Sequence, residues 1–307
     1  MNSQEFSMDM HFHTNLSDGR LSNEEILKKI LKSKWFFVAT DHDLVNTEFT
    51  ALAEKSGIIS AQWVEISILD KNCWYLHITA YAREFRWEIS DILENTRNWR
   101  RSKIYKQIKV LKKNWILINE KDFFSFFEDK WINVFNLNIY HLASYIYKYD
   151  YNLQRIREIT WTDMDKIEFL KRCLRDEWDF SNVWSATVPE YTPDIKDVIR
   201  IVKENGWITS IAHPNFSFKQ DEYRDKILYF LWLWMDAIEI NSRATAEQII
   251  IAQSCLKEDR LLTFWSDCHF TPYSEEDHWD FWEINQWLGK EIILENVEKI
   301  KSKIGIR

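Results

Sequence analysis

Apolar runs of strand length alternate with amphipathic, helix-like segments over the first 80 residues of the chain. The runs MDMHFHT and FFVATDHD are strand-like, and each ends in polar residues. Between them, SNEEILKKILKSK has a cap candidate at Ser22, acids in its first turn and lysines in its last, as a helix prefers. Strands alternating with helices are typical of βα units, so the pattern predicts an α/β fold.

The pattern changes after about residue 88. Residues 89–188 contain successive helical stretches without a strong strand-like run. From residue 189 the alternation returns, with the strand-like runs ITSIAHP, DAIEINS and LLTFWSDCHF. We therefore predict a βα part formed by residues 1–88 and 189–307, interrupted by a helical insertion at 89–188.

Composition narrows the possible partners. A net charge of −8 over 307 residues disfavours an extended nucleic-acid-binding face, which needs a basic stripe. The four cysteines form no CxxC pair, so neither a zinc knuckle nor a disulfide framework is indicated. The first residues lack a signal-peptide pattern, and the longest apolar run, residues 227–235, is too short to span a bilayer. We expect a cytoplasmic protein without a membrane partner.

Histidines and acids gather at the ends of the strand-like runs. His11 and His13 point to one side of a strand because side chains alternate with a period of two. Asp267 and His269 repeat that spacing at the last run. One such residue is usually structural, but strand ends that converge on one face would assemble them into a metal site. The predicted ligands are His11, His13, Asp18, His42, Glu65, His77, His213, Asp267 and His269. Imidazole and carboxylate together suit Mn, Fe or Zn better than Ca or Mg.

The segments DMHFHTNLSDG, VATDHD, WVEIS, LHITAYA, IAHPNF and FWSDCHF resemble the successive motifs of the PHP (polymerase and histidinol phosphatase) superfamily of metal-dependent phosphoesterases. The resemblance runs from about residue 8 to residue 270. It implies a distorted (β/α)7 barrel with an inserted helical subdomain and two or three divalent metals, Mn favoured. It further implies one metal on His11, His13, Glu65 and Asp267, a second on Glu65, His77 and His213, and a third on Asp18, His42 and His269.

The insertion most resembles that of a bacterial subgroup that hydrolyses nucleoside 3′,5′-bisphosphates and trims short RNA from its 5′ end. The helix-like stretch RNWRRSK supplies Arg97, Arg100 and Arg101 for substrate phosphates, although such a run is more often a solvated helix face. His141 is a candidate for contacting the substrate or protonating the leaving group, or else packs within the insertion. The substrate expected is a nucleotide or a short RNA end.

The expected reaction is hydrolysis of a phosphate monoester. A water bridging two metals has a lowered pKa, so hydroxide is available near neutral pH without a Ser or Cys nucleophile. Asp41 is a candidate to orient a neighbouring imidazole. The alternatives are a histidinol-phosphate-type phosphatase, an amidohydrolase, whose motifs fit poorly beyond HxH, and a non-catalytic PHP scaffold, which would usually have lost ligands.

The chain has 17 tryptophans and only 5 glycines, where average usage predicts roughly 21 glycines. Trp35, Trp115, Trp232 and Trp234 stand at helix ends or turns, and Trp63, Trp207 and Trp265 stand in or beside strands. A bulky residue is poor at a helix cap with positive φ. We hypothesise that most of these tryptophans are glycines encoded by UGA in a lineage that reads this codon as glycine.

Overall fold

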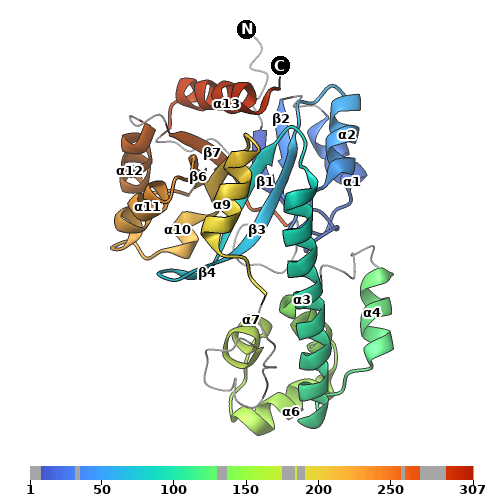
Figure 1. Cartoon of the computed structure of the whole chain (residues 1–307). Coiled ribbons are helices and arrows are strands. Elements are labelled where there is room, and N and C mark those ends of the chain that lie inside the picture. The colour runs from blue at the N-terminus through green and yellow to red at the C-terminus, as the bar shows by residue number, and fades with distance from the viewer. Residues whose placement is uncertain are drawn as a thin grey trace. The chain divides into compact units, whose positions relative to one another are not determined.

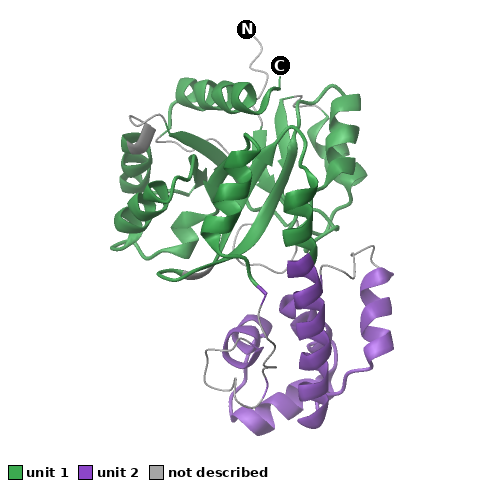
Figure 2. Ribbon diagram, in the orientation of Figure 1, with its two compact units in different colours: residues 1–94, 192–307 green, residues 95–191 purple. Residues whose placement is uncertain are grey.

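The computed structural model describes residues 8–31, 35–129, 137–174, 184, 191–241, 243–256, 260–269 and 288–306. The chain divides into two compact units (Figure 2). Unit 1 comprises residues 1–94 and 192–307, and unit 2 comprises residues 95–191. Among the described residues, no helix is both long enough and apolar enough to cross a bilayer.

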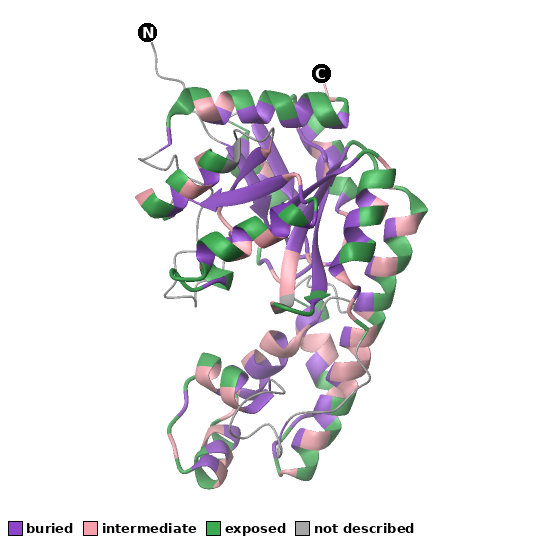
Figure 3. Ribbon diagram, turned by 60° about the vertical axis from the view of Figure 1, so that its left-hand side comes forward, coloured by how far each residue is buried: buried purple, intermediate pink, exposed green. Residues whose placement is uncertain are grey.

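Unit 1 is built on two sheets whose strands are mostly buried (Figure 3). In the first, β1 (Met8–Phe12) pairs in parallel with β2 (Phe36–Ala39). The second has the order β3–β4–β5–β6–β7. Its strands are β3 (Gln62–Asp70), β4 (Trp74–Ala82), β5 (Ile208–Ile211), β6 (Ala237–Asn241) and β7 (Leu261–Trp265). β4 is antiparallel to both of its neighbours, whereas β5, β6 and β7 are parallel. The predicted α/β class is confirmed.

The edges of the two sheets meet at isolated bridges. The bridges pair Phe12 with Cys268, Phe36 with Ile59 and His42 with Glu65. They bring the end of β1 to the segment after β7, and the end of β2 to β3. Between the described strands these single pairs do not form the continuous ladder of a closed barrel.

Helices surround the sheets of unit 1 (Figure 1). They are α1 (Asn23–Ile30), α2 (Thr47–Lys55), α9 (Ile195–Glu204), α10 (Pro214–Ser217), α11 (Tyr223–Trp232), α12 (Ala246–Leu256) and α13 (Lys290–Ile304). The predicted cap of α1 is confirmed: the Ser22 side chain accepts from the Glu25 backbone N–H, and the Glu25 carboxylate accepts from the Ser22 N–H. Both bonds satisfy N–H groups that a helix start leaves open.

The regular elements in the described part of unit 2 are all helical. α3 (Trp87–Lys113) begins in unit 1 and continues into unit 2, where it is followed by α4 (Glu120–Glu128), α5 (Ile139–Ile146), α6 (Asp150–Thr160), α7 (Lys166–Phe169) and the π-helical turn η2 (Leu170–Leu174). The unit has its own apolar core, to which Phe123, Leu142 and Phe169 belong. Residues 130–136, 175–183 and 185–188 of the expected insertion lie outside the described residues.

Several helices end in one type of turn, in which the residue after the helix has a positive φ. The N–H of that residue donates to the carbonyl three residues back, and the next N–H donates to the carbonyl five back. Glycine holds the position after α2, α9 and α13, at Gly57, Gly206 and Gly305, with φ of 75°, 72° and 74°. Tryptophan holds the same position after α3 and α11, at Trp115 and Trp234, with φ of 66° and 75°. The two residue types therefore occupy one backbone geometry that favours glycine.

These tryptophans gain little that would offset the strain. A left-handed residue with a Cβ costs about 1–2 kcal/mol. Trp115 and Trp234 are 69% and 67% exposed. Trp161, which follows α6 and was not singled out in the sequence, has φ 58° and is 90% exposed. Trp35 differs from the expectation, because its φ is not positive. The backbone supports the glycine hypothesis at three positions, and codon usage stays a prediction.

Trp234→Gly is expected to raise the free energy of unfolding by about 1 kcal/mol, because glycine removes the left-handed strain. Trp232 is a matched control: it is 72% exposed, only two residues away, and lies inside α11. Trp232→Gly should destabilise by up to about 1 kcal/mol, the cost of glycine in a helix. Urea unfolding of both variants measures the difference. Equal destabilisation by both substitutions would contradict the account.

The gene offers a direct check of the same hypothesis. We expect UGA codons at Trp115, Trp161 and Trp234. Codon sequencing, or the intact mass of the protein from its native host, decides the point. UGG at all three positions would refute the hypothesis.

Candidate metal centre

The carboxylate of Glu65 on β3 contacts five histidines of unit 1. It is fully buried, yet imidazole nitrogens surround both of its oxygens. Oε2 lies 2.8, 3.3 and 3.4 Å from nitrogens of His42, His13 and His11, and Oε1 lies 2.8 and 3.0 Å from nitrogens of His213 and His77. Side chains from β1, β3, β4 and the ends of β2 and β5 therefore converge on one carboxylate.

The antiparallel pairing of β3 with β4 places two of these residues on one face. Glu65 is opposite Thr79, and His77 is opposite Ser67. Residues two apart on a strand face the same side, so Glu65 and His77 are diagonal neighbours there. Sequence spacing alone could not show this, because it depends on the register of the hairpin.

Backbone hydrogen bonds join the end of β1 to the segment after β7. The Asp267 N–H donates to the His11 carbonyl, and the His13 N–H donates to the Cys268 carbonyl, both at 2.9 Å. Asp267 has a left-handed backbone with φ 57°. Its Oδ1 lies 3.1 Å from His13 Nε2 and 3.7 Å from His11 Nε2. The two pairs predicted from the sequence, His11 with His13 and Asp267 with His269, are therefore brought together by these backbone hydrogen bonds.

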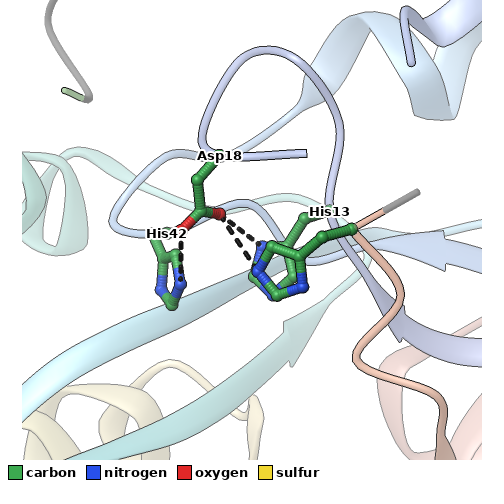
Figure 4. A group of neighbouring side chains, drawn as sticks. His13, Asp18 and His42 are labelled. Atoms are coloured by element: carbon green, nitrogen blue, oxygen red, sulfur yellow. Dashed lines mark ion pairs between the residues drawn. The ribbon is translucent and has the colours of Figure 1, made fainter. Parts of the chain in front are cut away.

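Asp18 lies in the loop after β1, and its carboxylate is the second one in the site that several histidines surround (Figure 4). Its carboxylate oxygens lie 3.3 Å from His269 Nε2, 3.5 Å from His42 Nε2 and 3.7 Å from His13 Nδ1. The loop turns back on itself at Gly19, where a Cβ would lie 2.4 Å from the His13 carbonyl oxygen. Only glycine fits this approach, which explains the SDG sequence of the loop.

Asp41 fixes that loop. Its buried carboxylate accepts from Thr14 N–H and Thr14 Oγ1 at 2.8 and 2.7 Å, from Ser17 Oγ at 2.5 Å and from Asn46 Nδ2 at 2.9 Å. Ser17 Oγ in turn lies 3.4 Å from His13 Nδ1. Asp41 thus holds the segment that carries Asp18, and it reaches an imidazole through Ser17.

The carboxylates of the centre are held in their charged form. Burial by itself raises their pKa values, but the attraction of the surrounding imidazoles is stronger and lowers the pKa values of Glu65, Asp18 and Asp267 well below the usual range. The site therefore presents three negative charges, one on the fully buried Glu65 and two on the partly buried Asp18 and Asp267. Such a group requires cations, either protons or metals.

The pKa values of the imidazoles are shifted in different directions. Burial lowers the pKa of His13 to about 3, and burial also lowers the pKa of His77. Burial opposes charge on His11, His213 and His269 as well, but neighbouring carboxylates raise their pKa values, that of His269 to about 10. The pair His11 Nε2 and His13 Nε2 lies only 3.3 Å apart, and the pair His77 Nδ1 and His213 Nε2 only 3.2 Å. At these distances either one nitrogen of each pair donates to the other, or both nitrogens bind one metal ion.

The distances fit divalent metals. Bonds of about 2.0–2.2 Å to N and O place ligand atoms about 3.0–3.5 Å apart around a first-row metal. The contacts given above between ring nitrogens and carboxylate oxygens run from 2.8 to 3.7 Å. Three groups have donor atoms within 4.8 Å of one another: His13–Asp18–His42–His269, His11–His13–Glu65 and His42–Glu65–His77. His13, His42 and Glu65 each belong to two groups, and His213 and Asp267 belong to none, so geometry alone does not divide the nine residues among separate ions.

Glu239 on β6 belongs to the site, although sequence reasoning missed it. It is 1% exposed, and its carboxylate lies 3.1 Å from His11 Nδ1 and accepts from the His213 N–H at 2.9 Å. His213 itself has φ 33° at the start of α10. The available signal was an acid in the apolar strand AIEIN, since buried acids almost always have partners.

Two buried tryptophans, Trp265 and Trp63, make close ring contacts in and beside the candidate metal centre. Trp265 is fully buried, with its ring centroid 5.9 Å from that of His11 and 5.8 Å from that of His213. Trp63 pairs with Tyr81 across the strands, with ring centroids 3.4 Å apart, closer than the usual 4.5–7 Å for aromatic pairs. In the described part of the chain neither indole N–H has a hydrogen-bond partner. Crowding of this kind is expected if smaller residues belong there.

The remaining candidates lie in unit 2. Arg97, Arg100 and Arg101 on α3 are three and four residues apart, so they share a helix face. Arg97 and Arg101 are partly exposed, whereas Arg100 is buried. His141 is also buried, and its Nδ1 accepts from the Asn138 N–H at 3.1 Å, which caps α5. This contact gives His141 a structural role within the insertion, one of the two roles expected from the sequence. Its role in binding the substrate or protonating the leaving group stays a prediction.

Comparison with known proteins establishes the fold. No protein-family model and no curated protein matches the chain. A structure from Bifidobacterium adolescentis, described as a metal-dependent phosphoesterase, aligns with 96% of this chain and 96% of its own, with a TM-score of 0.67 and 18% identity. An amidohydrolase from Chromobacterium violaceum, solved with sulfate and without metal, aligns over 97% and 96%, with a TM-score of 0.70 and 17% identity. The chain thus has a fold found in proteins described as metal-dependent phosphoesterase and amidohydrolase.

The metal-free protein should lose stability as the pH rises above about 6.5. A histidine with a raised folded pKa stabilises the fold fully below its unfolded pKa, and this stabilisation is lost as the pH rises through the folded pKa, about 10 for His269. In chelator, Tm should therefore fall between about pH 6.5 and pH 9. Added Mn²⁺ should reduce the fall, because metal replaces the protons. A constant Tm in chelator over this range would contradict the assignment.

Proposed function

We propose that the protein is a metal-dependent hydrolase of phosphate monoesters. One observation carries the proposal: five imidazole nitrogens and the carboxylate of Glu65 form a buried cluster with donor spacings that suit divalent metals. A cluster of this composition has no evident role in packing, since it fully buries one charged carboxylate, Glu65, and places two more, Asp18 and Asp267, beside it. The fold shared with a protein described as a metal-dependent phosphoesterase supports the reaction class.

The proposed ligand sets are those that the resemblance to the PHP superfamily implies. One metal would be held by His11, His13, Glu65 and Asp267, a second by Glu65, His77 and His213, and a third by Asp18, His42 and His269. The Glu65 contacts support the first two sets, because Oε2 faces the His11–His13 pair and Oε1 faces the His77–His213 pair. His42 of the third set also lies 2.8 Å from Oε2, so these contacts do not separate the third set from the first. Manganese is favoured, with iron or zinc as alternatives, because the donors are nitrogen and oxygen.

Bound divalent metals would supply a water of lowered pKa and neutralise phosphoryl charge. The protein's own groups set up that chemistry. Glu65 offers one oxygen to each side of the cluster, which fixes the spacing between the two proposed ligand sets. The loop held by Asp41 presents Asp18, and the left-handed backbone at Asp267 directs its carboxylate to the HxH pair. The nearly complete burial of the HxH pair and Glu65 limits the access of bulk water.

The proposed substrate is a small phosphorylated molecule, a nucleoside 3′,5′-bisphosphate or the 5′ end of a short RNA. Sulfate, which has the same tetrahedral shape as phosphate, is present in the Chromobacterium violaceum structure. The arginine face of α3 offers guanidinium groups for a second phosphate, since arginine binds phosphate oxygens in a bidentate manner. His141 is proposed as a further substrate contact in unit 2.

A hydrolysis screen with added Mn²⁺ tests the reaction class, with released phosphate measured for the phosphorylated compounds and released amine measured for the amide. The panel contains 3′,5′-bisphosphoadenosine, a short 5′-phosphorylated RNA, histidinol phosphate and an N-acyl amino acid. We expect phosphate release from at least one phosphorylated compound, with the nucleotide or RNA preferred. Glu65→Gln should lower the rate at least about 100-fold, because it removes the bridging charge. Hydrolysis of the amide alone, or an unchanged rate in the variant, would sink the proposal.

The arginine face generates a separate prediction. Arg101→Ala should raise KM about 10-fold for a bisphosphate, because one charge-assisted contact is lost, and should leave kcat nearly unchanged. Lys106→Ala, an exposed position on the same helix, is the control. Steady-state kinetics on both variants provides the measurement. Equal KM values for the two variants would remove Arg101 from the substrate site.

A further inference from the structure

A single buried carboxylate outside the nine predicted ligands contacts two of them. The carboxylate of Glu239 on β6 accepts hydrogen bonds from four groups: His11 Nδ1 at 3.1 Å, the His213 N–H at 2.9 Å, Thr79 Oγ1 at 2.7 Å and Tyr81 OH at 3.0 Å. Two of these donors belong to proposed metal ligands, and the other two come from the neighbouring strand β4. The two hydroxyls keep the carboxylate in place.

The contact with His11 determines which nitrogen of that ring is available. Its Nδ1 faces Glu239, whereas its Nε2 faces the centre, 3.4 Å from Glu65 and 3.7 Å from Asp267. A carboxylate beside Nδ1 favours the tautomer with the proton on that nitrogen. The lone pair of Nε2 is then directed at the proposed metal, and the hydrogen bond also fixes the plane of the ring.

The contact with His213 acts on the backbone. His213 has φ 33°, a conformation that a residue with a Cβ rarely adopts. The Glu239 oxygen accepts the N–H of this residue and so holds the left-handed turn. With the turn in place, His213 Nε2 lies 2.8 Å from Glu65.

We propose that Glu239 is a positioning residue for the metal centre, which orients His11 through its ring and His213 through its backbone. One carboxylate thereby controls a ligand on each side of Glu65. The inference rests on the proposed metal site and adds to it a residue that binds no metal itself. A purely structural role, in which Glu239 only satisfies Thr79 and Tyr81, is the alternative that an experiment must separate.

Metal binding by the full-length chain provides the test. The protein is stripped with chelator, and the Kd for Mn²⁺ is measured by equilibrium dialysis. Glu239→Ala should raise the Kd about 10- to 100-fold, the usual effect of losing a residue that orients a metal-binding histidine. Glu239→Gln keeps the shape and an accepting oxygen, so it should recover part of the affinity. The visible spectrum of the Co²⁺-loaded protein should change in Glu239→Ala, because the ligand geometry changes.

A matched control is available on β3. Asp70 is also a buried acid, 3% exposed, and it accepts from Tyr229 OH at 2.8 Å. Asp70→Ala should lower Tm and leave the Mn²⁺ affinity and the Co²⁺ spectrum as in the unchanged chain. A Glu239→Ala protein with lowered Tm but unchanged affinity and spectrum would overturn the inference. If Glu239→Ala does not fold, an unchanged affinity in Glu239→Gln overturns it, and a weakened one supports it.

The test separates this inference from the proposed function. Weaker metal binding in the Glu239 variants supports the positioning role even if the chain releases no phosphate from any substrate. Failure of the unchanged chain to bind Mn²⁺ or Co²⁺ overturns both.

Discussion

The structure of unit 1 depends on the burial of one carboxylate among five imidazole nitrogens. Glu65 is fully buried, and a buried charge is tolerated only when opposite charge accompanies it. Asp18 and Asp267 add two more acids nearby, so the cluster carries a surplus of negative charge unless cations are bound. Protons on some histidines can supply part of the compensation, and divalent metals can supply all of it. The donor set and its charge fit divalent metals, and this fit is the basis of the proposed metal site.

The fold delivers the ligands through three kinds of local structure. The register of β3 with β4 places Glu65 and His77 on one face. Backbone pairing of the β1 end with the segment after β7 brings Asp267 to the HxH pair. Left-handed backbone at Asp267 and His213 turns these two residues inward. Strained conformations of non-glycine residues are expensive and commonly occur at functional sites, where surrounding contacts hold them. At His213 one such contact is Glu239.

The sequence was sufficient for the α/β class, the cap of α1 and the choice of nine side chains that the structure brings together. These rest on local signals: period-two spacing, polar strand ends and capping residues. It was insufficient for Glu239, because a single acid in an apolar strand does not reveal its partner. The single bridges that join the two sheets in the described part of the chain also escaped it, since they depend on long-range pairing. Trp161 was missed for a different reason: only the backbone φ distinguishes it from an ordinary surface residue.

The central claim is that Glu65 bridges two divalent metals. Crystals soaked with Mn²⁺ and measured near the manganese absorption edge test it most directly, because anomalous scattering locates each ion. The account predicts at least two peaks, one beside Oε2 with the HxH pair and one beside Oε1 with His77 and His213. Peaks confined to other parts of the chain, with none at the Glu65 carboxylate, would contradict it.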